Sequence, residues 1–223
     1  MSIKNALTER SKKRRKNVIG KALILCGVGL LLVVGITNIV NYNRGRKLVA
    51  DFEDMYQMAT GNDADTTGSD ESDSGINPHI SITQEDITDY LAQGGVIGVL
   101  EIPVIGCKEP IKEEVFSYSL GHVLGTSPIG GDGNCCIAGH RNYPNGRYFK
   151  NLDMVKEGDE IVIRTLEGEY TYTITESFVV TPDQVEVLDY YGGSTLTLIT
   201  CTPVYIGTHR LIVRARLTSS VKY

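Results

Sequence analysis

Residues 195–203 read TLTLITCTP, an apolar run of strand-forming residues that contains Cys201 and ends at Pro203. Leucine, isoleucine and threonine in such a run favour a β-strand. Proline lacks the N–H that a ladder hydrogen bond needs, so the strand stops there. Cys201 is therefore expected at a strand end facing a loop, where a substrate can reach it. Free cysteines are more often small buried hydrophobes, and position alone favours that interpretation.

On both sides of this run, short stretches of strand-forming residues recur from residue 95 to near the C-terminus. Turn sequences such as Gly-Gly-Asp-Gly and Pro-Asn-Gly separate the apolar runs. Seven or eight strands in about 125 residues indicate an all-β domain, either a closed barrel or a sandwich. A short helix around residues 147–152 is expected to close one end, and another begins near Ser81 or Thr83, either of which suits a cap. The predicted strands are residues 96–102, 104–111, 135–140, 160–165, 170–181, 196–201 and 210–217.

The N-terminal part carries a candidate membrane anchor. Residues 22–40 (ALILCGVGLLLVVGITNIV) are nineteen residues without a charge, long enough to cross the hydrocarbon core of a bilayer. A buried core helix would show a polar stripe, and a cleaved signal peptide would have a shorter run with a small-residue cleavage site. Eight Lys/Arg precede the run and three follow it, so the positive-inside rule predicts a cytoplasmic N-terminus and an extracellular remainder.

Charge and composition divide the chain into segments. Residues 1–47 carry eleven Lys/Arg and one Glu, whereas residues 48–223 carry eleven Lys/Arg and twenty-six Asp/Glu. An acidic body argues against a nucleic-acid partner, because phosphate binding needs clustered basic residues. We expect four segments: a cytoplasmic basic tail (1–21), a transmembrane anchor (22–43), a stalk with an acidic flexible linker (44–80), and the catalytic domain (81–223).

Two further residues would make Cys201 a workable nucleophile. His140 also follows an apolar β run, and Arg210 opens the run after Cys201, where a hairpin would return it beside the thiol. A nearby cation favours the thiolate, and a histidine can protonate a leaving amine. Arginine offers a permanent charge and planar donors for an oxyanion or a peptide backbone. Each signal is weak when taken alone.

Together these residues resemble the sortase family. Thr197-Leu-Ile-Thr-Cys201 is similar to the TLxTC signature, Ala138-Gly-His140 to the histidine motif, and Arg210 with Leu-Ile-Val to the arginine motif. The resemblance covers roughly residues 95–217. It implies an eight-stranded β-barrel with short helices, preceded here by the N-terminal transmembrane helix.

The same resemblance implies an activity for the expected site. Cys201 would attack the Thr–Gly bond of an LPxTG-like sorting signal on a secreted surface or pilin protein, forming a thioester. An amine of a cell-wall precursor or a pilin lysine would then resolve it. His140 would be the general acid/base and Arg210 would bind the oxyanion or the signal. Thr200 is a candidate for substrate binding, although strand packing explains it equally well. We expect no cofactor and no metal ligand among the site residues. No acidic stretch matches a calcium loop, and the sequence leaves calcium dependence open.

The sequence features of this chain fit more than one class of sortase. Residues 201–211 (CTPVYIGTHRL) resemble the sortases that polymerise pilins, and the chain as a whole looks most like sortases of class C or D. Asn77-Pro78-His79 is a poor match for the lid of that class, and residues 219–223 (SSVKY) do not match the second, C-terminal membrane helix that the class often has. A lidless enzyme that anchors proteins to the cell wall is an equal alternative.

Three other hypotheses use the same residues differently. A membrane-tethered cysteine hydrolase would use water as the acceptor, and a non-catalytic extracellular β-domain would simply bury Cys201. A zinc module would draw its ligands from Cys135 or Cys136, His140, Cys201 and His209. Neighbouring strand residues point to opposite faces, and no C-x-x-C pair exists, which disfavours zinc.

Overall fold

The computed structural model describes residues 3–60, 83–114, 118–141 and 148–223, and it divides into two compact units. The first unit is Met1–Asn43 and the second is Arg44–Tyr223. The acidic segment from residue 61, the candidate lid at 77–79 and the alternative cap Ser81 lie outside the described residues.

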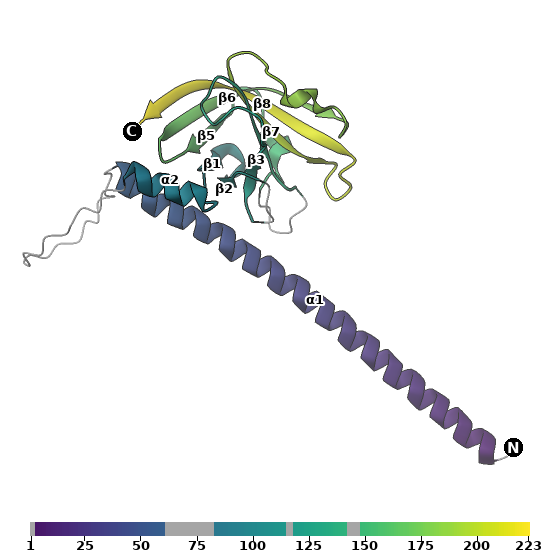
Figure 1. Ribbon diagram of the computed structural model, residues 1–223. Coiled ribbons are helices and arrows are strands. Elements are labelled where there is room, and N and C mark those ends of the chain that lie inside the picture. The colour runs from purple at the N-terminus through teal and green to yellow at the C-terminus, as the bar shows by residue number, and fades with distance from the viewer. Residues whose placement is uncertain (1–2, 61–82, 115–117, 142–147) are drawn as a thin grey trace, which may run out of the picture. The chain divides into compact units, whose positions relative to one another are not determined.

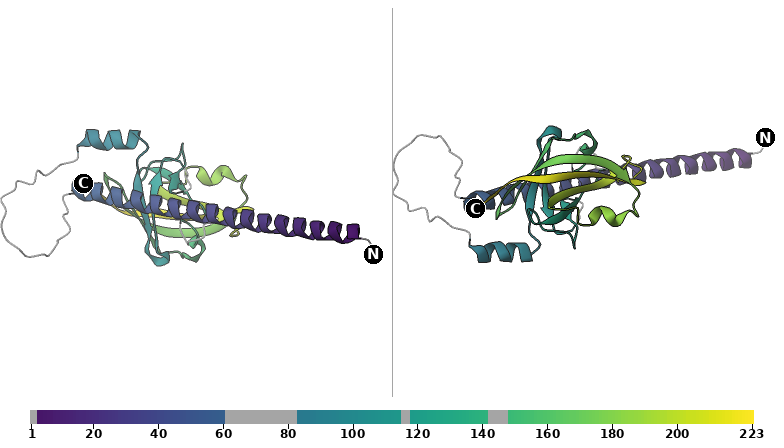
Figure 2. Two further views of the ribbon diagram at one scale, coloured as in Figure 1. Left: turned by 90° about the horizontal axis from the view of Figure 1, so that it is seen from below. Right: turned by 90° about the horizontal axis from the view of Figure 1, so that it is seen from above.

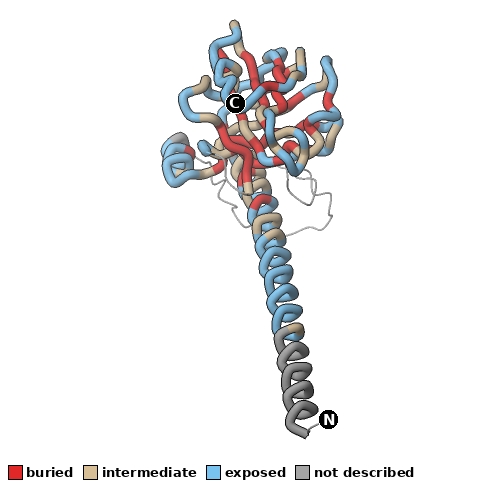
Figure 3. The backbone as a smooth tube through the Cα atoms, turned by 90° about the vertical axis from the view of Figure 1, so that its right-hand side faces the viewer, coloured by how far each residue is buried: buried red, intermediate tan, exposed pale blue. Residues whose placement is uncertain are grey.

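The first unit is the N-terminal part of helix α1 (Ile3–Thr60). Within the described residues, α1 contains the one helical stretch, Gly20–Met58, that is long and apolar enough to cross a membrane. Most side chains between residues 21 and 40 are exposed, including Leu25 and Leu31, as the pale blue of the tube shows (Figure 3). Apolar groups exposed on all sides suit a lipid surrounding better than water.

The second unit contains a closed barrel of eight strands, which confirms the expected fold (Figure 1). The strand order around the barrel is β1-β2-β3-β4-β7-β8-β6-β5. Two neighbouring pairs, β2–β3 and β4–β7, are parallel, and the other pairs are antiparallel. The strands are β1 (Gly98–Ile102), β2 (Cys107–Lys112), β3 (Leu120–His122), β4 (Gly133–Ala138), β5 (Glu160–Arg164), β6 (Gly168–Val180), β7 (Ser194–Thr202) and β8 (His209–Lys222).

Alternation along the strands fills the barrel with apolar side chains. Ile137 on β4, Leu198 on β7 and Val213 on β8 are all fully buried in the main core. Residues one step along these strands point to the outer face instead. The two longest strands, β6 and β8, lie side by side and form much of one wall (Figure 2). On β4, β7 and β8, the side chains that alternate with these core residues form the outer face of the barrel.

Strand boundaries differ from the predicted ones where special backbone residues occur. The predicted strand 104–111 begins only at Cys107, because Pro103–Ile105 form a short 3-10 helix, η1. Pro103 fits its first turn, and Gly106 ends it with φ +61°, a left-handed conformation that glycine adopts readily. The strand predicted over 210–217 continues to Lys222.

The predicted short helices are only partly recovered. Helix α2 (Gln84–Ala92) begins after Thr83, whose side chain accepts from the backbone N–H of Asp86 while Asp86 accepts from that of Thr83. This reciprocal capping box makes Thr83 the cap. For the helix expected at 147–152, residue 147 lies outside the described residues. The chain instead makes a turn followed by the 3-10 helix η2 (Leu152–Met154).

The C-terminal part of α1 belongs to the second unit and packs on the barrel. Phe52 is 1% exposed and lies in a second apolar cluster with Ile87 of α2 and Val99 of β1. Glu53 on the same helix forms salt bridges with Lys108 of β2, at 2.5 Å, and with Arg164 of β5, at 3.5 Å. Residues 44–58 are therefore part of the folded barrel unit.

Candidate functional site

Cys201 and Arg210 face each other across two antiparallel strands. Cys201 of β7 is the register partner of Arg210 of β8. Side chains directly opposite in such a pair have Cβ atoms about 5 Å apart. The hairpin expected from the sequence therefore returns Arg210 beside the thiol. The cysteine is free and partly exposed, as a nucleophile must be.

The turn between β7 and β8 fixes both side chains. The Arg210 guanidinium donates from Nη1 to the carbonyl oxygens of Gly207, at 3.2 Å, and His209, at 3.0 Å. A Cβ at Gly207 would lie 3.6 Å from Cβ and 4.0 Å from Sγ of Cys201, so the turn backbone lies against the thiol. Gly207 has φ +70°, which explains why glycine stands at this close approach.

His140 follows the strand on the other side of β7 from Arg210. Strands β4 and β7 run parallel, and their last paired residues are Ala138 and Ile199. His140 and Cys201 each follow two positions later. The backbone N–H of Gly139 donates to the Ile199 carbonyl at 3.0 Å, so the contact between the strands continues beyond this pair. His140 is exposed. Cys201 lies on β7, which stands between β4 and β8; His140 follows the end of β4, and Arg210 lies on β8.

Thr200 has a different position from these three residues. Its side chain is 2% exposed, and its hydroxyl donates to the Gly139 carbonyl at 2.7 Å. That bond joins the ends of β7 and β4 directly before Cys201 and His140. A role of Thr200 in substrate binding stays a prediction, and the contact present in the structure is one that positions its neighbours.

An apolar groove of about 210 Å³ begins at Arg210 on the outer face of the barrel. We call it the outer groove. Its floor is made by Ala138, Ile199 and Ile212, which alternate outward on β4, β7 and β8. Its wall is the connection between β6 and β7, which contains the 3-10 helix η3 (Val185–Leu188). The complete lining is Val123, Ala138, Val180, Thr181, Pro182, Gln184, Val185, Val187, Leu188, Ile199, Arg210 and Ile212.

Asn134 fastens this wall to the floor. Its side-chain amide donates to the carbonyl oxygens of Val187, at 3.0 Å, and Asp189, at 3.1 Å. Its carbonyl oxygen accepts from the Thr197 hydroxyl at 2.7 Å. Asn134 is 3% exposed, so these bonds are shielded from water. Sequence reasoning missed both Asn134 and the groove wall; apolar Val185, Val187 and Leu188 within a loop were the available signal.

The other described histidines and cysteines of the barrel unit have different surroundings. His122 is buried and pairs with Glu113 at 3.0 Å, while His209 is exposed at the start of β8. Burial raises the pKa of the Cys136 thiol to about 11, despite opposing hydrogen bonds, and raises that of Cys135 further. Cys135 belongs to the main core and Cys136 does not, as strand alternation predicts. In the part of the chain that the structure describes, no three His, Cys, Asp or Glu side chains are grouped to hold a metal ion.

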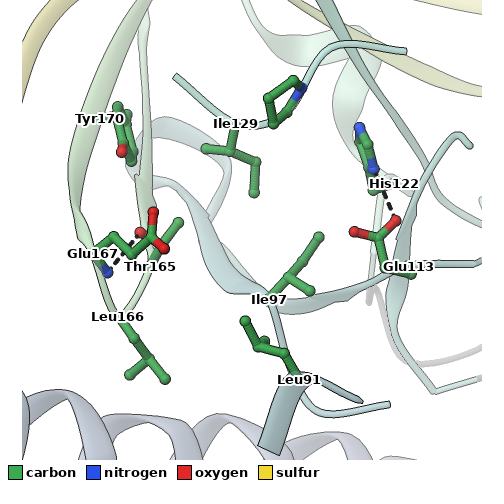
Figure 4. Close-up of a pocket in the computed structure, with 10 residues that line it drawn as sticks. Leu91, Ile97, Glu113, His122, Ile129, Thr165, Leu166, Glu167 and Tyr170 are labelled. Carbon is green, nitrogen blue, oxygen red and sulfur yellow. Dashed lines mark hydrogen bonds and ion pairs between the residues drawn. The ribbon is translucent and has the colours of Figure 1, made fainter. Parts of the chain in front are cut away.

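A second cavity, also about 210 Å³, lies at the other end of the barrel (Figure 4). Cys201 pairs with the first part of β8, whereas Gly168, just beyond the cavity-lining Glu167, pairs with Lys222 near its end. The close-up shows His122 and Glu113 pointing toward each other within this lining. Its lining contains no cysteine, so it offers no thiol for thioester chemistry.

Comparisons with known proteins identify the family of the barrel unit. The family model of the Sortase domain matches residues 99–218, which is more than half of the chain. Sortase A of Bacillus anthracis is 32% identical over 128 residues, which cover 56% of this chain and 61% of that protein. Sortase A of Listeria monocytogenes is 26% identical over 207 residues, covering 90% and 91%.

The solved structures include a similar barrel. A structure of the sortase D5 transpeptidase of Clostridium perfringens superposes with a TM-score of 0.58 at 27% identity. The match covers 78% of this chain and 98% of that one. This chain spans only about three fifths of the Bacillus anthracis relative. The domain match, the relatives and the barrel together show that the chain belongs to the sortase family.

Proposed function

We propose that this chain is a cysteine transpeptidase that cleaves an LPxTG-like sorting signal between threonine and glycine and joins the threonine to an amine. The observation that carries the proposal is the placement of Cys201 between Arg210 and the end of the His140 strand, where the outer groove begins. The motif of the substrate comes from the family resemblance. The acceptor is an amine of a cell-wall precursor or a pilin lysine.

The first half of the reaction makes a thioester. The Cys201 thiolate attacks the threonine carbonyl carbon, and the displaced electron pair gives an oxyanion that Arg210 stabilises. When the oxyanion collapses, the C–N bond to glycine breaks. His140 gives a proton to the departing glycine amine. Arg210 is suited to this task because its Nη1 is already held by two carbonyls of the adjacent turn.

The second half regenerates the enzyme. The acceptor amine loses a proton to His140 as its nitrogen attacks the thioester carbon. The C–S bond breaks, the thiolate of Cys201 is released, and a new amide bond joins threonine to the acceptor. If water attacks in place of the amine, the product is a free threonine carboxylate and the enzyme is a hydrolase.

The outer groove suits the apolar residues that precede threonine in the signal. Its floor and wall are mostly aliphatic, with Ile199 and Ile212 below and Val185 and Leu188 at the side. Burial of aliphatic side chains there stabilises a complex by about 25 cal/mol for each Å² removed from water. An extended signal lying in this groove would bring its threonine carbonyl to Cys201.

The proposed location is the outer side of a cell membrane. The helix Gly20–Met58 contains the apolar run that would span the bilayer, and the heavier positive charge precedes it. This orientation would leave the basic tail (1–21) in the cytoplasm and the barrel outside, where secreted surface proteins are found. Labelling of single cysteines with a membrane-impermeant maleimide would test it, since Cys201 should react from outside in intact cells.

The experiment uses the full-length chain in detergent micelles. It is incubated with a library of LPxTG-like peptides together with glycine-based, diaminopimelate-based and lysine-based amines, and the products are identified by mass spectrometry. Cleavage between threonine and glycine with transfer to one amine supports the proposal and identifies the acceptor. Cys201→Ala should abolish both, whereas Cys26→Ala, the matched change in the membrane helix, should abolish neither. Intact peptides and a Cys201 that resists alkylation in the folded protein would overturn the proposal.

A further inference from the structure

Arg141 directly follows His140, yet its side chain is almost completely buried. It is 3% exposed, although arginine is rarely buried unless it is paired. Its Nη2 lies 2.7 Å from a carboxylate oxygen of Asp153, and the Asp153 side chain is itself 56% exposed. Its Nε donates to the Lys150 carbonyl at 3.2 Å and its Nη1 donates to the Thr202 hydroxyl at 2.9 Å. All three guanidinium nitrogens are therefore engaged.

The partners of Arg141 belong to separate parts of the chain. Asp153 lies in η2, Lys150 precedes it, and Thr202 is the last residue of β7, directly after Cys201. One planar group thus connects the segment after His140, the segment leading into η2 and the residue after Cys201. A guanidinium can make these bonds in three fixed directions at once, whereas a lysine ammonium is a point charge on a flexible stem.

The backbone around His140 is closed by a second contact. The N–H of Phe149 donates to the His140 carbonyl at 3.2 Å. Together with the bond from Arg141 to Lys150, it brings residues 149–150 back against residues 140–141. Phe149 is fully buried in the main core, so this return segment is anchored in the barrel interior. His140 is therefore held through its backbone while its side chain stays exposed.

We propose that Arg141 is the positioning residue of the active site: it fixes the histidine-bearing segment to the cysteine-bearing strand and so sets the approach of His140 to Cys201. This inference rests on the proposed function of those two residues. The connection matters because β4 ends at Ala138, and the hydrogen bond from Thr200 to Gly139 lies just beyond that strand end. Beyond that point, the bond from Arg141 to Thr202 connects the segment after β4 to the end of β7. Small displacements of a catalytic group cost about 100-fold in rate.

The first test compares two variants of the full-length chain carrying Cys26→Ala, in detergent. Arg141→Lys keeps the charge but replaces the three fixed donor directions of the guanidinium by a point charge. Thr202→Val removes only the acceptor beside Cys201 with almost no change in shape. We expect kcat for signal cleavage to fall by about 10- to 100-fold in Arg141→Lys, and less in Thr202→Val, with KM nearly unchanged. The matched control is Arg164→Lys, an ion-paired arginine on β5 away from the site. It should keep the kcat of the parent chain.

The second test does not depend on cleavage of any peptide. Iodoacetamide alkylation of Cys201 is followed by mass spectrometry in the parent chain and in Arg141→Lys, each with and without His140→Ala. If Arg141 positions His140, removing the imidazole should slow alkylation in the parent chain and change it little in Arg141→Lys, because the two changes are coupled. A purely structural arginine would lower the melting temperature and leave the effect of His140→Ala intact.

The possible outcomes separate this inference from the proposed function. Unchanged kcat in folded Arg141→Lys and Thr202→Val, or an undiminished effect of His140→Ala in Arg141→Lys, overturns the positioning role alone. If the parent chain neither cleaves peptides nor responds to His140→Ala in the alkylation assay, the proposed function fails and Arg141 has no pair to position. If Arg141→Lys does not fold, the kcat of Thr202→Val decides the question.

Discussion

The residue with the clearest placement beside Cys201 is Arg210. It lies directly opposite on the next strand, and one nitrogen of its guanidinium is held by the carbonyls of Gly207 and His209. This contact fixes the guanidinium before any substrate arrives. Preorganised donors are effective in catalysis because they need no reorganisation when charge develops on the substrate. For the same reason, a flexible side chain such as lysine at this position would supply the charge without the preorganised donors.

Replacement of Arg210 should therefore affect the chemical step. We expect Arg210→Ala to lower kcat for signal cleavage by about 100- to 1000-fold, as loss of an oxyanion donor does in other enzymes. Arg210→Lys should recover only a small part, since lysine lacks the planar donors. The matched control is Arg216→Ala on the same strand, which should retain activity. Steady-state kinetics on the best signal peptide would measure each effect, and a normal kcat for Arg210→Ala would contradict the assignment.

The buried thiol of Cys136 gives a prediction about pH. Its pKa is raised to about 11, so at pH 8 it is protonated and unreactive toward iodoacetamide in the folded protein, whereas the Cys201 side chain is partly exposed. An unfolded thiol ionises near pH 8.5. Because the folded state holds the proton more tightly, Cys136 contributes stability below about pH 8.5 that is lost as the pH rises toward about 11.

Urea unfolding at several pH values would measure this contribution. The free energy of unfolding should decrease between about pH 8.5 and 11, and Cys136→Ala should make that decrease shallower. Alkylation mapped by mass spectrometry at pH 8 gives an independent check. Modification of Cys136 in the folded chain at that pH would contradict the prediction.

Among the elements, the connection between β6 and β7 determines the width of the outer groove. It is joined to β4 and β7 through Asn134, which bonds to Val187, Asp189 and Thr197. Asn134 itself lies on β4, Val187 and Asp189 lie in the connection, and Thr197 lies on β7. One buried side chain thus joins the connection, which is the groove wall, to two strands. The position of the wall should therefore respond to substitution of Asn134.

Asn134→Ala should loosen the groove wall and weaken binding of the signal. The lost hydrogen bonds are worth about 1–3 kcal/mol, so we expect KM to rise by about 10-fold, with a smaller effect on kcat. Alkylation of Cys201 by iodoacetamide should be unchanged, because the small reagent does not use the groove. Thr218→Ala, which removes a hydroxyl bond near the far end of β8, is the control. A fall in kcat with no change in KM would contradict this role for the wall.

Sequence reasoning succeeded where a local pattern carries the information. The alternating runs around Cys201 and the turn residues between runs predict the strands, and the candidate caps Ser81 and Thr83 predict the start of α2 to within two residues. Strand β2 was placed too early because Pro103 and Gly106 form a turn inside an otherwise continuous apolar run. The groove wall and the buried position of Arg141 depend on contacts between residues about 60 apart, which periodicity does not encode.

At the scale of the whole molecule, the helix that contains the membrane anchor also contributes to the barrel unit. The spacing of Leu48, Phe52 and Met55 predicts a helix, but its packing partners are distant in the sequence. Phe52 is buried against them, and Glu53 connects the helix to β2 and β5. Tyr56 also forms a hydrogen bond with Tyr223. A chain that begins near residue 83 would expose the apolar surface that this helix covers.

Phe52→Ala should destabilise the barrel unit although it lies before the strands in sequence. Truncation of a buried phenylalanine costs about 3–5 kcal/mol. Urea unfolding of the full-length chain in detergent, followed by tyrosine fluorescence, would measure the loss. Met58→Ala on the same helix, where the side chain is 54% exposed, should change the free energy of unfolding by less than about 0.5 kcal/mol. Equal stability of Phe52→Ala and the parent chain would show that residues 44–58 do not support the barrel.

Because the barrel closes between β5 and β1, the described sheet has no free strand edge. A bound peptide therefore cannot become an additional strand, which is how many proteins recognise extended segments through main-chain hydrogen bonds. Discrimination among signals must come from the side chains that the groove accepts. Inhibitors that imitate the peptide backbone alone should bind poorly, whereas compounds that keep the apolar side chains on a different scaffold should retain affinity.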